Sequence, residues 1–351
     1  MSFPKYPQKQ SQLDMQNGTF RLKPQAAYEL IFRALTGAGT SPANARYFSD
    51  AILDTELSGL EGHGFYWLQY YCAHVQTGKV DGKARPVVKR LSPVSYIVDA
   101  KSGFAHPAIE KGFERLIPAA QKYGIAALGI TKSYNSATLG YHTGFLARHG
   151  LVAFGFTNSV PAIAPVGGKK PIIGTNPMSF AVPGRKSKIA FLVDQSSSAV
   201  AWSAVKRASE ENKSIPMGWA LDADGKPTTD SVRGLAGSMA PSGGYKGFGQ
   251  GLIVEVMCAA LADSFRGLQM GSFTENDGKP IGCGQFFIAL SPKLFAPDSF
   301  DRQIAALIKS VTSQEGARMP NSRRAANQKW LQREGLPIEP ALYERLKSFH
   351  K

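Results

Sequence analysis

Residues 125–159, IAALGITKSYNSATLGYHTGFLARHGLVAFGFTNS, contain the pattern that decides the fold class. An apolar strand pattern over 125–130 is followed by helical spacing of apolar residues over 138–150 and by a second strand pattern over 151–159. Short apolar runs bounded by turn residues are typical of strands in a covered sheet, whereas apolar residues every three to four positions are typical of an amphipathic helix. The alternation therefore predicts an α/β fold, in which helices cover a sheet.

The alternation continues on both sides of this stretch. Strand patterns at 94–100, 179–183 and 188–196 and helical patterns at 107–124 and 197–212 extend the predicted sheet and its helical cover. No GxGxxG follows a strand and no GxxxxGKS occurs. The sequence therefore supports neither the standard dinucleotide-binding fold nor a P-loop.

Three helices are predicted before the α/β region, over residues 24–37, 42–58 and 65–78. Ser41 is suited to cap the second of them, because a serine oxygen can accept from a free backbone N–H. Pro42 is suited to the first helical position, where a missing N–H removes no hydrogen bond.

Composition limits the function classes. With 351 residues, of which 43% are hydrophobic and 19% charged, the chain can form one large or two ordinary globular domains. Its apolar runs fall short of the roughly 18–20 residues of a membrane span. The first twenty residues are polar and lack the apolar stretch of a secretion signal, so we expect a cytoplasmic protein. Three scattered cysteines and six histidines show no metal-ligand spacing, and we expect no catalytic metal.

The net charge of +15, from 41 Lys and Arg against 26 Asp and Glu, leaves nucleic-acid binding as an alternative. The basic residues are scattered, with small clusters at 169–170 and 323–324, and no nucleic-acid-binding motif accompanies them. A phosphate-bearing small molecule or an acidic substrate would use the same charge. The glycine-rich stretch 239–251 leads into an apolar helix predicted over 251–265, and Lys246 makes this loop a candidate anion site.

Six short motifs follow one another in a distinctive order: GHG (62–64), KSYNSATLG (132–140), GTNP (174–177), DQSSS (194–198), GGYKG (243–247) and RMPNS (318–322). This series resembles the type-2 malate/L-lactate dehydrogenase family of NAD(P)-dependent oxidoreductases, from about residue 25 to about residue 340. The resemblance implies a fold distinct from the Rossmann domain and an active homodimer. It implies a central α/β domain, 91–284, that binds the coenzyme, and a helical domain built from 1–90 and 285–351.

His63 corresponds to the family's proton donor to the C=O or C=N bond that is reduced. An imidazole suits this role because it titrates near neutral pH. Three positions depart from many relatives: Gly62 replaces a serine, Trp67 replaces an arginine and Ala204 replaces an aspartate. The groups that orient the histidine in cyclic-imine reductases are thus missing. One guanidinium that could bind a substrate carboxylate through two hydrogen bonds is missing as well. Trp67 is instead expected to line the substrate pocket.

The resemblance assigns further roles. Asn135 stands where some members have a second catalytic histidine, and an amide cannot shuttle a proton at neutral pH, so we expect His63 to be the single acid/base. His106 is an alternative acid/base that matches no family motif. Thr175 corresponds to the residue that contacts the substrate carboxylate. The positions that match coenzyme contacts are Asn135, Ser136, Ala137, Thr138, Leu139, Ser159, Asp194, Gln195, Ser196, Lys246, Arg318, Pro320, Asn321 and Ser322.

The resemblance therefore predicts an NAD(P)H-dependent reductase that acts on a small 2-imino or 2-oxo carboxylate. The aromatic residues after His63 favour a cyclic imine of the Δ1-pyrroline-2-carboxylate type. The alternative is a dehydrogenase of a 2-hydroxy acid such as malate, lactate or sulfolactate. The choice between NADH and NADPH stays open, as does a third hypothesis, a catalytically inactive relative that only binds ligands.

Overall fold

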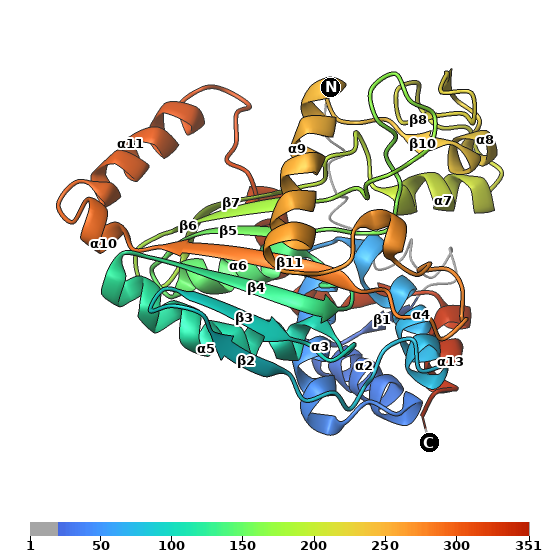
Figure 1. Ribbon diagram of the computed structural model, residues 1–351, viewed down its shortest axis with the longest axis horizontal. Coiled ribbons are helices and arrows are strands. Elements are labelled where there is room, and N and C mark those ends of the chain that lie inside the picture. The colour runs from blue at the N-terminus through green and yellow to red at the C-terminus, as the bar shows by residue number, and fades with distance from the viewer. Residues whose placement is uncertain (1–19, 351) are drawn as a thin grey trace.

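A seven-stranded mixed sheet forms the centre of the protein in the computed structural model, which describes residues 20–350 (Figure 1). Its strand order is β2 (Val87–Arg90), β3 (Ser95–Asp99), β4 (Ile125–Ser133), β11 (Cys283–Leu290), β5 (Val152–Thr157), β6 (Met178–Pro183) and β7 (Ile189–Gln195). β3 pairs with β4 in parallel, and the other neighbours pair antiparallel. The predicted α/β class is confirmed.

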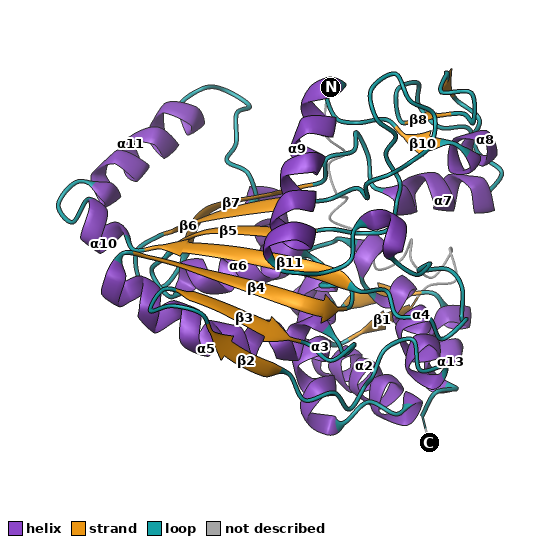
Figure 2. Cartoon of the chain, viewed as in Figure 1, coloured by secondary structure: helices purple, strands orange, loops and turns teal. Residues whose placement is uncertain are grey.

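Successive side chains of β11 point to opposite faces of the sheet and show what covers each face. Phe287 and Ala289 are fully buried against α5 (Ala105–Tyr123) and α6 (Leu139–Arg148). Phe286 and Ile288 point to the other face, where α9 (Tyr245–Glu255) and the π-helical turn η2 (Val256–Leu261) cover the sheet. Figure 2 shows the strands between these helices. A strand that is covered on both faces reads as a continuous apolar run, as residues 286–290 of β11 do.

Both ends of the described chain meet in one helical layer (Figure 1). Its helices are α2 (Pro24–Ala38), α3 (Pro42–Leu57), α4 (Phe65–Gln76), α12 (Ser322–Glu334) and α13 (Pro340–Lys347), and β1 (Phe20–Leu22) pairs antiparallel with β12 (Leu336–Ile338). Ser41 caps α3 by accepting from the N–H of Asn44, and Pro42 is the first residue of that helix, as predicted. The predicted domain boundary at 284/285 falls inside β11, and the division into two domains stays a prediction.

A small unit packs at one end of the sheet. It consists of α7 (Trp202–Glu210), α8 (Ser231–Ala236) and a sheet of β10 (Ser238–Met239), β8 (Ala220–Leu221) and β9 (Pro227–Thr228), which share the apolar cluster around Ile163 and Val205. The helix predicted over 197–212 is shorter than expected, because 196–198 form a hydrogen-bonded turn before it.

The prediction for residues 239–265 was partly wrong. α9 already begins at Tyr245, so Lys246 lies in its first turn and not in a loop. Gly247 in this helix serves close packing, because a Cβ there would overlap the backbone of Ser197 and Ser242.

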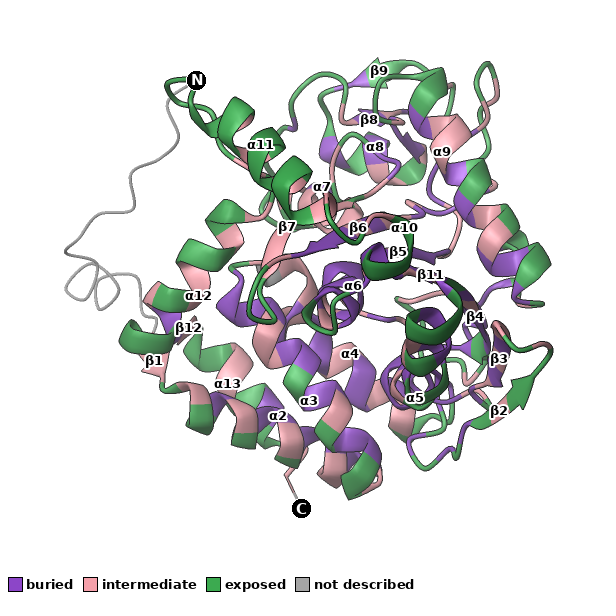
Figure 3. Cartoon of the chain, turned by 90° about the vertical axis from the view of Figure 1, so that its left-hand side faces the viewer, coloured by how far each residue is buried: buried purple, intermediate pink, exposed green. Residues whose placement is uncertain are grey.

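Two helices near the C-terminus lie at the periphery. α10 (Pro292–Phe295) precedes α11 (Phe300–Thr312), which stands away from the body in Figure 1. α11 has no buried residue (Figure 3). Among the described residues, none of the helices is long and apolar enough to span a membrane.

Candidate active site

A cavity of about 1070 Å³ lies at one end of the central sheet. β4, β5 and β7 run parallel to one another, because antiparallel strands separate them, and their carboxyl ends meet there. The residues after each of these ends line the cavity, over 135–139, 157–162 and 194–196. The helical layer, α7 and the segment 270–274 form its other walls. Ligand sites commonly lie outside the carboxyl ends of strands in open α/β sheets.

His63 enters this cavity from a single helical turn, η1 (Glu61–His63), just before α4. The backbone N–H of Phe65 donates to the buried carboxylate of Glu56, which fixes the start of α4. Gly64 lies directly beside that carboxylate, and a Cβ at this position would overlap it. The second glycine of GHG is therefore required by close packing, and the packing fixes the backbone that holds His63.

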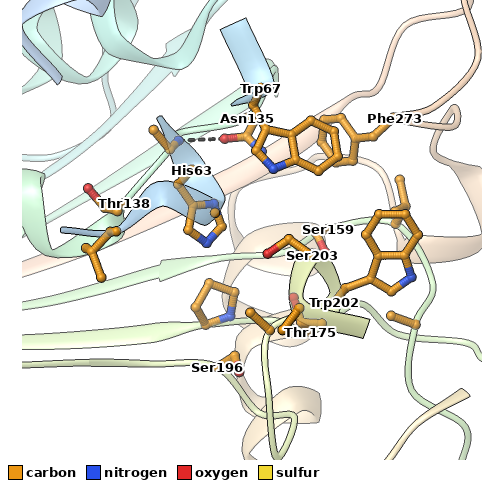
Figure 4. A pocket seen from close by; sticks show the side chains of 18 of the residues that line it. His63, Trp67, Asn135, Thr138, Ser159, Thr175, Ser196, Trp202, Ser203 and Phe273 are labelled. Atoms are coloured by element: carbon orange, nitrogen blue, oxygen red, sulfur yellow. Dashed lines mark hydrogen bonds between the residues drawn. The ribbon is translucent and has the colours of Figure 1, made fainter. Parts of the chain in front are cut away.

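The surroundings of His63 favour its neutral form. Burial is the main cause that lowers the pKa of its imidazole; the carboxylate of Asp194 raises this pKa and the guanidinium of Arg324 lowers it. Asp194 Oδ2 accepts from the N–H of Gly140 at 3.0 Å and from Arg324 Nη1 at 3.0 Å. Among the residues described, none forms a hydrogen bond with the His63 ring. The ring is therefore available to a ligand (Figure 4).

The loop after β4 is held in a strained form against the cavity. Ala137 has a φ of 52°, and its N–H donates to Asn135 Oδ1 at 2.6 Å. His142 Nε2, from α6, donates to the carbonyl of Ser136 at 3.1 Å. The Ser136 hydroxyl is buried and has no hydrogen-bond partner among the described residues. A buried hydroxyl without a partner costs free energy, so a polar ligand group at this loop would complete the site.

Aromatic side chains form part of the wall opposite the sheet. The ring centroids of Trp67 and Trp202 are 6.4 Å apart, and Phe273 lies on the segment 270–274 (Figure 4). Thr175 lies in the turn before β6, where its carbonyl accepts from the N–H of Ser197 at 2.8 Å while the residue faces the cavity. Apolar rings and hydroxyl groups thus meet in the same space.

Comparison with known proteins identifies the family to which this fold belongs. Residues 22–347 match the model of the family described as malate/L-lactate dehydrogenase. The chain belongs to this family. It is 38% identical to the (2R)-3-sulfolactate dehydrogenase (NADP(+)) of Chromohalobacter salexigens, over 92% of this chain and 96% of the relative. It is 34% identical to Δ1-pyrroline-2-carboxylate reductase 1 of Burkholderia ambifaria, over 91% of this chain and 94% of the relative.

A solved structure of the malate/L-lactate dehydrogenase family agrees with this assignment. The Δ1-piperideine-2-carboxylate reductase of Pseudomonas syringae pvar. tomato superposes with a TM-score of 0.88 at 29% identity, covering 94% of this chain and 99% of that chain. The protein is therefore an NAD(P)-dependent oxidoreductase.

The structure of this malate/L-lactate dehydrogenase family member brings most of the predicted site residues together. The cavity is lined by His63, Trp67, Thr175, Asn135, Ser136, Ala137, Thr138, Leu139, Ser159, Asp194, Gln195 and Ser196. It is not lined by Lys246, Arg318, Pro320, Asn321 or Ser322, whose coenzyme contacts stay predictions. His106 lies outside the lining as well; its ring is buried against Phe48 and His142.

Several lining residues were not predicted from the sequence. Arg324 belongs to the basic pair 323–324, which was noted only as a charge cluster, and it forms the ion pair with Asp194. Arg207 and Lys213 line the cavity from α7 and the segment after it. Ser203, also on α7, had no sequence signal because an isolated serine in a predicted helix is unremarkable.

Proposed function

We propose that this protein reduces C2 of a small cyclic 2-imino carboxylate, of the Δ1-pyrroline-2-carboxylate type. The observation that carries the proposal is the position of His63 in a cavity walled by Trp67 and Trp202. Its titratable ring has no hydrogen bond to any of the described residues. Aromatic faces suit a flat ring, and an imidazole suits a proton donor. The 34% identity to a named Δ1-pyrroline-2-carboxylate reductase supports the same substrate class.

In this proposal His63 donates a proton from a ring N–H to the imine nitrogen, and Thr175 with nearby backbone groups holds the carboxylate. The nicotinamide coenzyme, when bound, supplies the hydride. The loop 135–139, Ser159 and the segment 194–196 would hold it, and the unpartnered Ser136 hydroxyl supports this placement. Water is kept from the reacting atoms by Trp67, Trp202 and Phe273.

One observation favours a second candidate, a dehydrogenase of 2-hydroxy acids with an additional acidic group. Arg207 and Lys213 line the cavity, and guanidinium and ammonium groups bind sulfonates or carboxylates well. The 38% identity to a named sulfolactate dehydrogenase points in the same direction.

A substrate panel tests the proposal. We expect NADH or NADPH oxidation, followed by absorbance, with a kcat/KM at least roughly tenfold higher for cyclic 2-imino acids than for any 2-oxo acid, since one pocket contact is worth about 1–3 kcal/mol. The panel consists of Δ1-pyrroline-2-carboxylate, Δ1-piperideine-2-carboxylate, pyruvate, oxaloacetate and 3-sulfopyruvate. A preference for 3-sulfopyruvate would establish the second candidate. Turnover of none of them would overturn both substrate assignments.

We further propose that the protein is a cytoplasmic homodimer. Apolar side chains on α9 and η2 are exposed: Ile253 to 57%, Val256 to 55% and Leu261 to 58%. The apolar side of α11 also lacks cover, with Leu307 exposed to 49%. Contiguous exposed apolar side chains are typical of protein interfaces. A second copy of this chain would bury these residues.

This arrangement predicts that Ile253→Asp weakens the dimer. A buried, unpaired carboxylate at the interface is costly, and we expect the dissociation constant to rise by at least roughly a hundredfold. Light scattering after size exclusion measures the mass over a range of concentrations. Lys122→Asp, on the exposed side of α5, is the matched control and stays dimeric. A wild-type protein that is monomeric throughout would contradict the homodimer.

A further inference from the structure

Gly62 and Ser203 lie against each other although they come from η1 and α7. A Cβ built on Gly62 would lie 2.8 Å from Ser203 Oγ and 3.8 Å from Ser203 Cβ. Gly62 does not have a positive φ, so its backbone conformation is open to any residue. With the Ser203 hydroxyl in this position, one contact disfavours a side chain at residue 62: the hydroxyl occupies the space that the Cβ would need.

The Ser203 hydroxyl has no other evident task. The N-cap residue of α7 is Ala201, so Ser203 does not cap its own helix. Within residues 20–350, no hydrogen bond involves the Ser203 hydroxyl or the His63 ring. Figure 4 shows this hydroxyl pointing toward His63, the residue that follows Gly62. Two polar groups without partners thus face each other in a half-buried site.

We propose that Ser203 is the positioning residue of His63: its hydroxyl accepts from one ring N–H, so that the other ring N–H faces the substrate. A hydrogen bond to one imidazole nitrogen sets which nitrogen is protonated and how the ring is turned. Ser203 keeps this bond in both states, because the remaining N–H of the ring still donates after the proton is transferred. This inference rests on the proposed role of His63 as proton donor.

The charged groups around His63 do not supply the same orientation. Asp194 of β7 raises the pKa of the His63 ring and Arg324 of α12 lowers it. Asp194 Oδ2 accepts from Arg324 and from the N–H of Gly140, and in the described part of the chain neither carboxylate oxygen is hydrogen-bonded to the His63 ring. Arg324 is a donor that cannot accept from the ring. Ser203 is therefore the hydroxyl that can hold the imidazolium without changing the net charge of the site.

The first test compares Ser203→Ala with Ser203→Thr. A hydrogen bond to a charged group is worth roughly 10- to 100-fold in rate, so we expect Ser203→Ala to lower kcat by about that factor. KM for the substrate and the affinity for NADPH stay within about twofold, because the proposal gives the Ser203 hydroxyl a bond to His63 and none to either ligand. The pH at which reduction declines moves down, since the imidazolium has lost an acceptor. Ser203→Thr retains the hydroxyl and most of the activity, and Ser209→Ala, on the same helix outside the cavity, behaves as wild type.

The second test moves the hydroxyl from residue 203 to residue 62, on the other side of the contact. Gly62→Ser alone loses activity, because its Cβ collides with Ser203 Oγ. In Gly62→Ser with Ser203→Ala, the nearest contact becomes the 3.8 Å between the two Cβ atoms, which is ordinary packing, and a hydroxyl returns to the same space. We expect the double variant to exceed both single variants in kcat. Additive losses contradict the proposal, whereas near-normal turnover of His63→Ala would instead overturn the proposed function.

Discussion

His63→Ala lowers kcat for reduction by roughly 10²- to 10⁴-fold, the usual contribution of a positioned general acid. The affinity for NADPH, measured by the change in coenzyme fluorescence, stays within about twofold, because the coenzyme is proposed to bind along 135–139 and 194–196. His149→Ala is the matched control: this histidine is exposed at the end of α6 and lies outside the cavity. Turnover of His63→Ala close to that of wild type would contradict the assignment.

The pH dependence of the wild type gives an independent check on His63. Burial lowers the pKa of its imidazole below the ordinary 6.5. Reduction needs the protonated ring, so kcat/KM is constant below this pKa and falls roughly tenfold per pH unit above it. The reverse reaction, oxidation of the product, needs the neutral ring, so its kcat/KM has already reached its plateau at pH 7. His63→Ala removes both dependences, and a limb that persists in the variant belongs to another group.

The parts of the fold that depend on local sequence were predictable. Helices α2, α3 and α4 follow from apolar periodicity, and the start of α3 follows from Ser41 and Pro42. The position of β11 between β4 and β5 was not predictable, because strand pairing between residues so far apart in the chain leaves no local pattern. The glycines of α9 suggested a loop, although packing against Ser197 and Ser242 is what requires Gly247.

The same distinction holds for the site. His63 and the loop 135–139 are continuous motifs, and the resemblance identified them before the structure placed them in one cavity. Arg324 and Ser203 come from α12 and α7, and only tertiary packing brings them to His63. The departure at Gly62 was evident in the sequence, but its physical reason, the volume of one hydroxyl, was not.

Acidification from pH 7 to pH 4.5 lowers the free energy of unfolding by several kcal/mol, because buried histidines must stay neutral. Burial lowers the pKa of His74 to about 4 and that of His142 to about 4. It lowers the pKa of His106 well below 6.5, and His142 beside it lowers it further. In the unfolded chain these rings take up protons near pH 6.5, so the unfolded state gains protons that the folded state does not bind.

The direction and the size of the stability change follow from this difference in proton binding between the folded and unfolded states. The contribution of these neutral histidines to the free energy of unfolding is fully present above pH 6.5 and is lost as the pH falls toward 4. The loss is about 3 kcal/mol for each of His74 and His142 at the lower limit. The two together approach the roughly 5–15 kcal/mol that holds a typical domain folded. Burial raises the pKa values of Asp54 and Glu110, and these two carboxyl groups oppose part of the loss.

Urea unfolding of His142→Gln at pH 7 and pH 4.5 isolates one of these contributions. Glutamine retains a donor for the carbonyl of Ser136, which accepts from His142 Nε2 at 3.1 Å, but it does not titrate. We expect this variant to be less stable than wild type at pH 7 and to lose about 2 kcal/mol less on acidification, since most of the histidine's contribution falls within this pH range. His149→Gln, at an exposed position, loses as much as wild type. A packing defect caused by the substitution lowers the stability equally at both pH values, so it does not affect the difference between pH 7 and pH 4.5. Equal losses in wild type and His142→Gln would therefore show that the acid sensitivity of the fold lies in other groups.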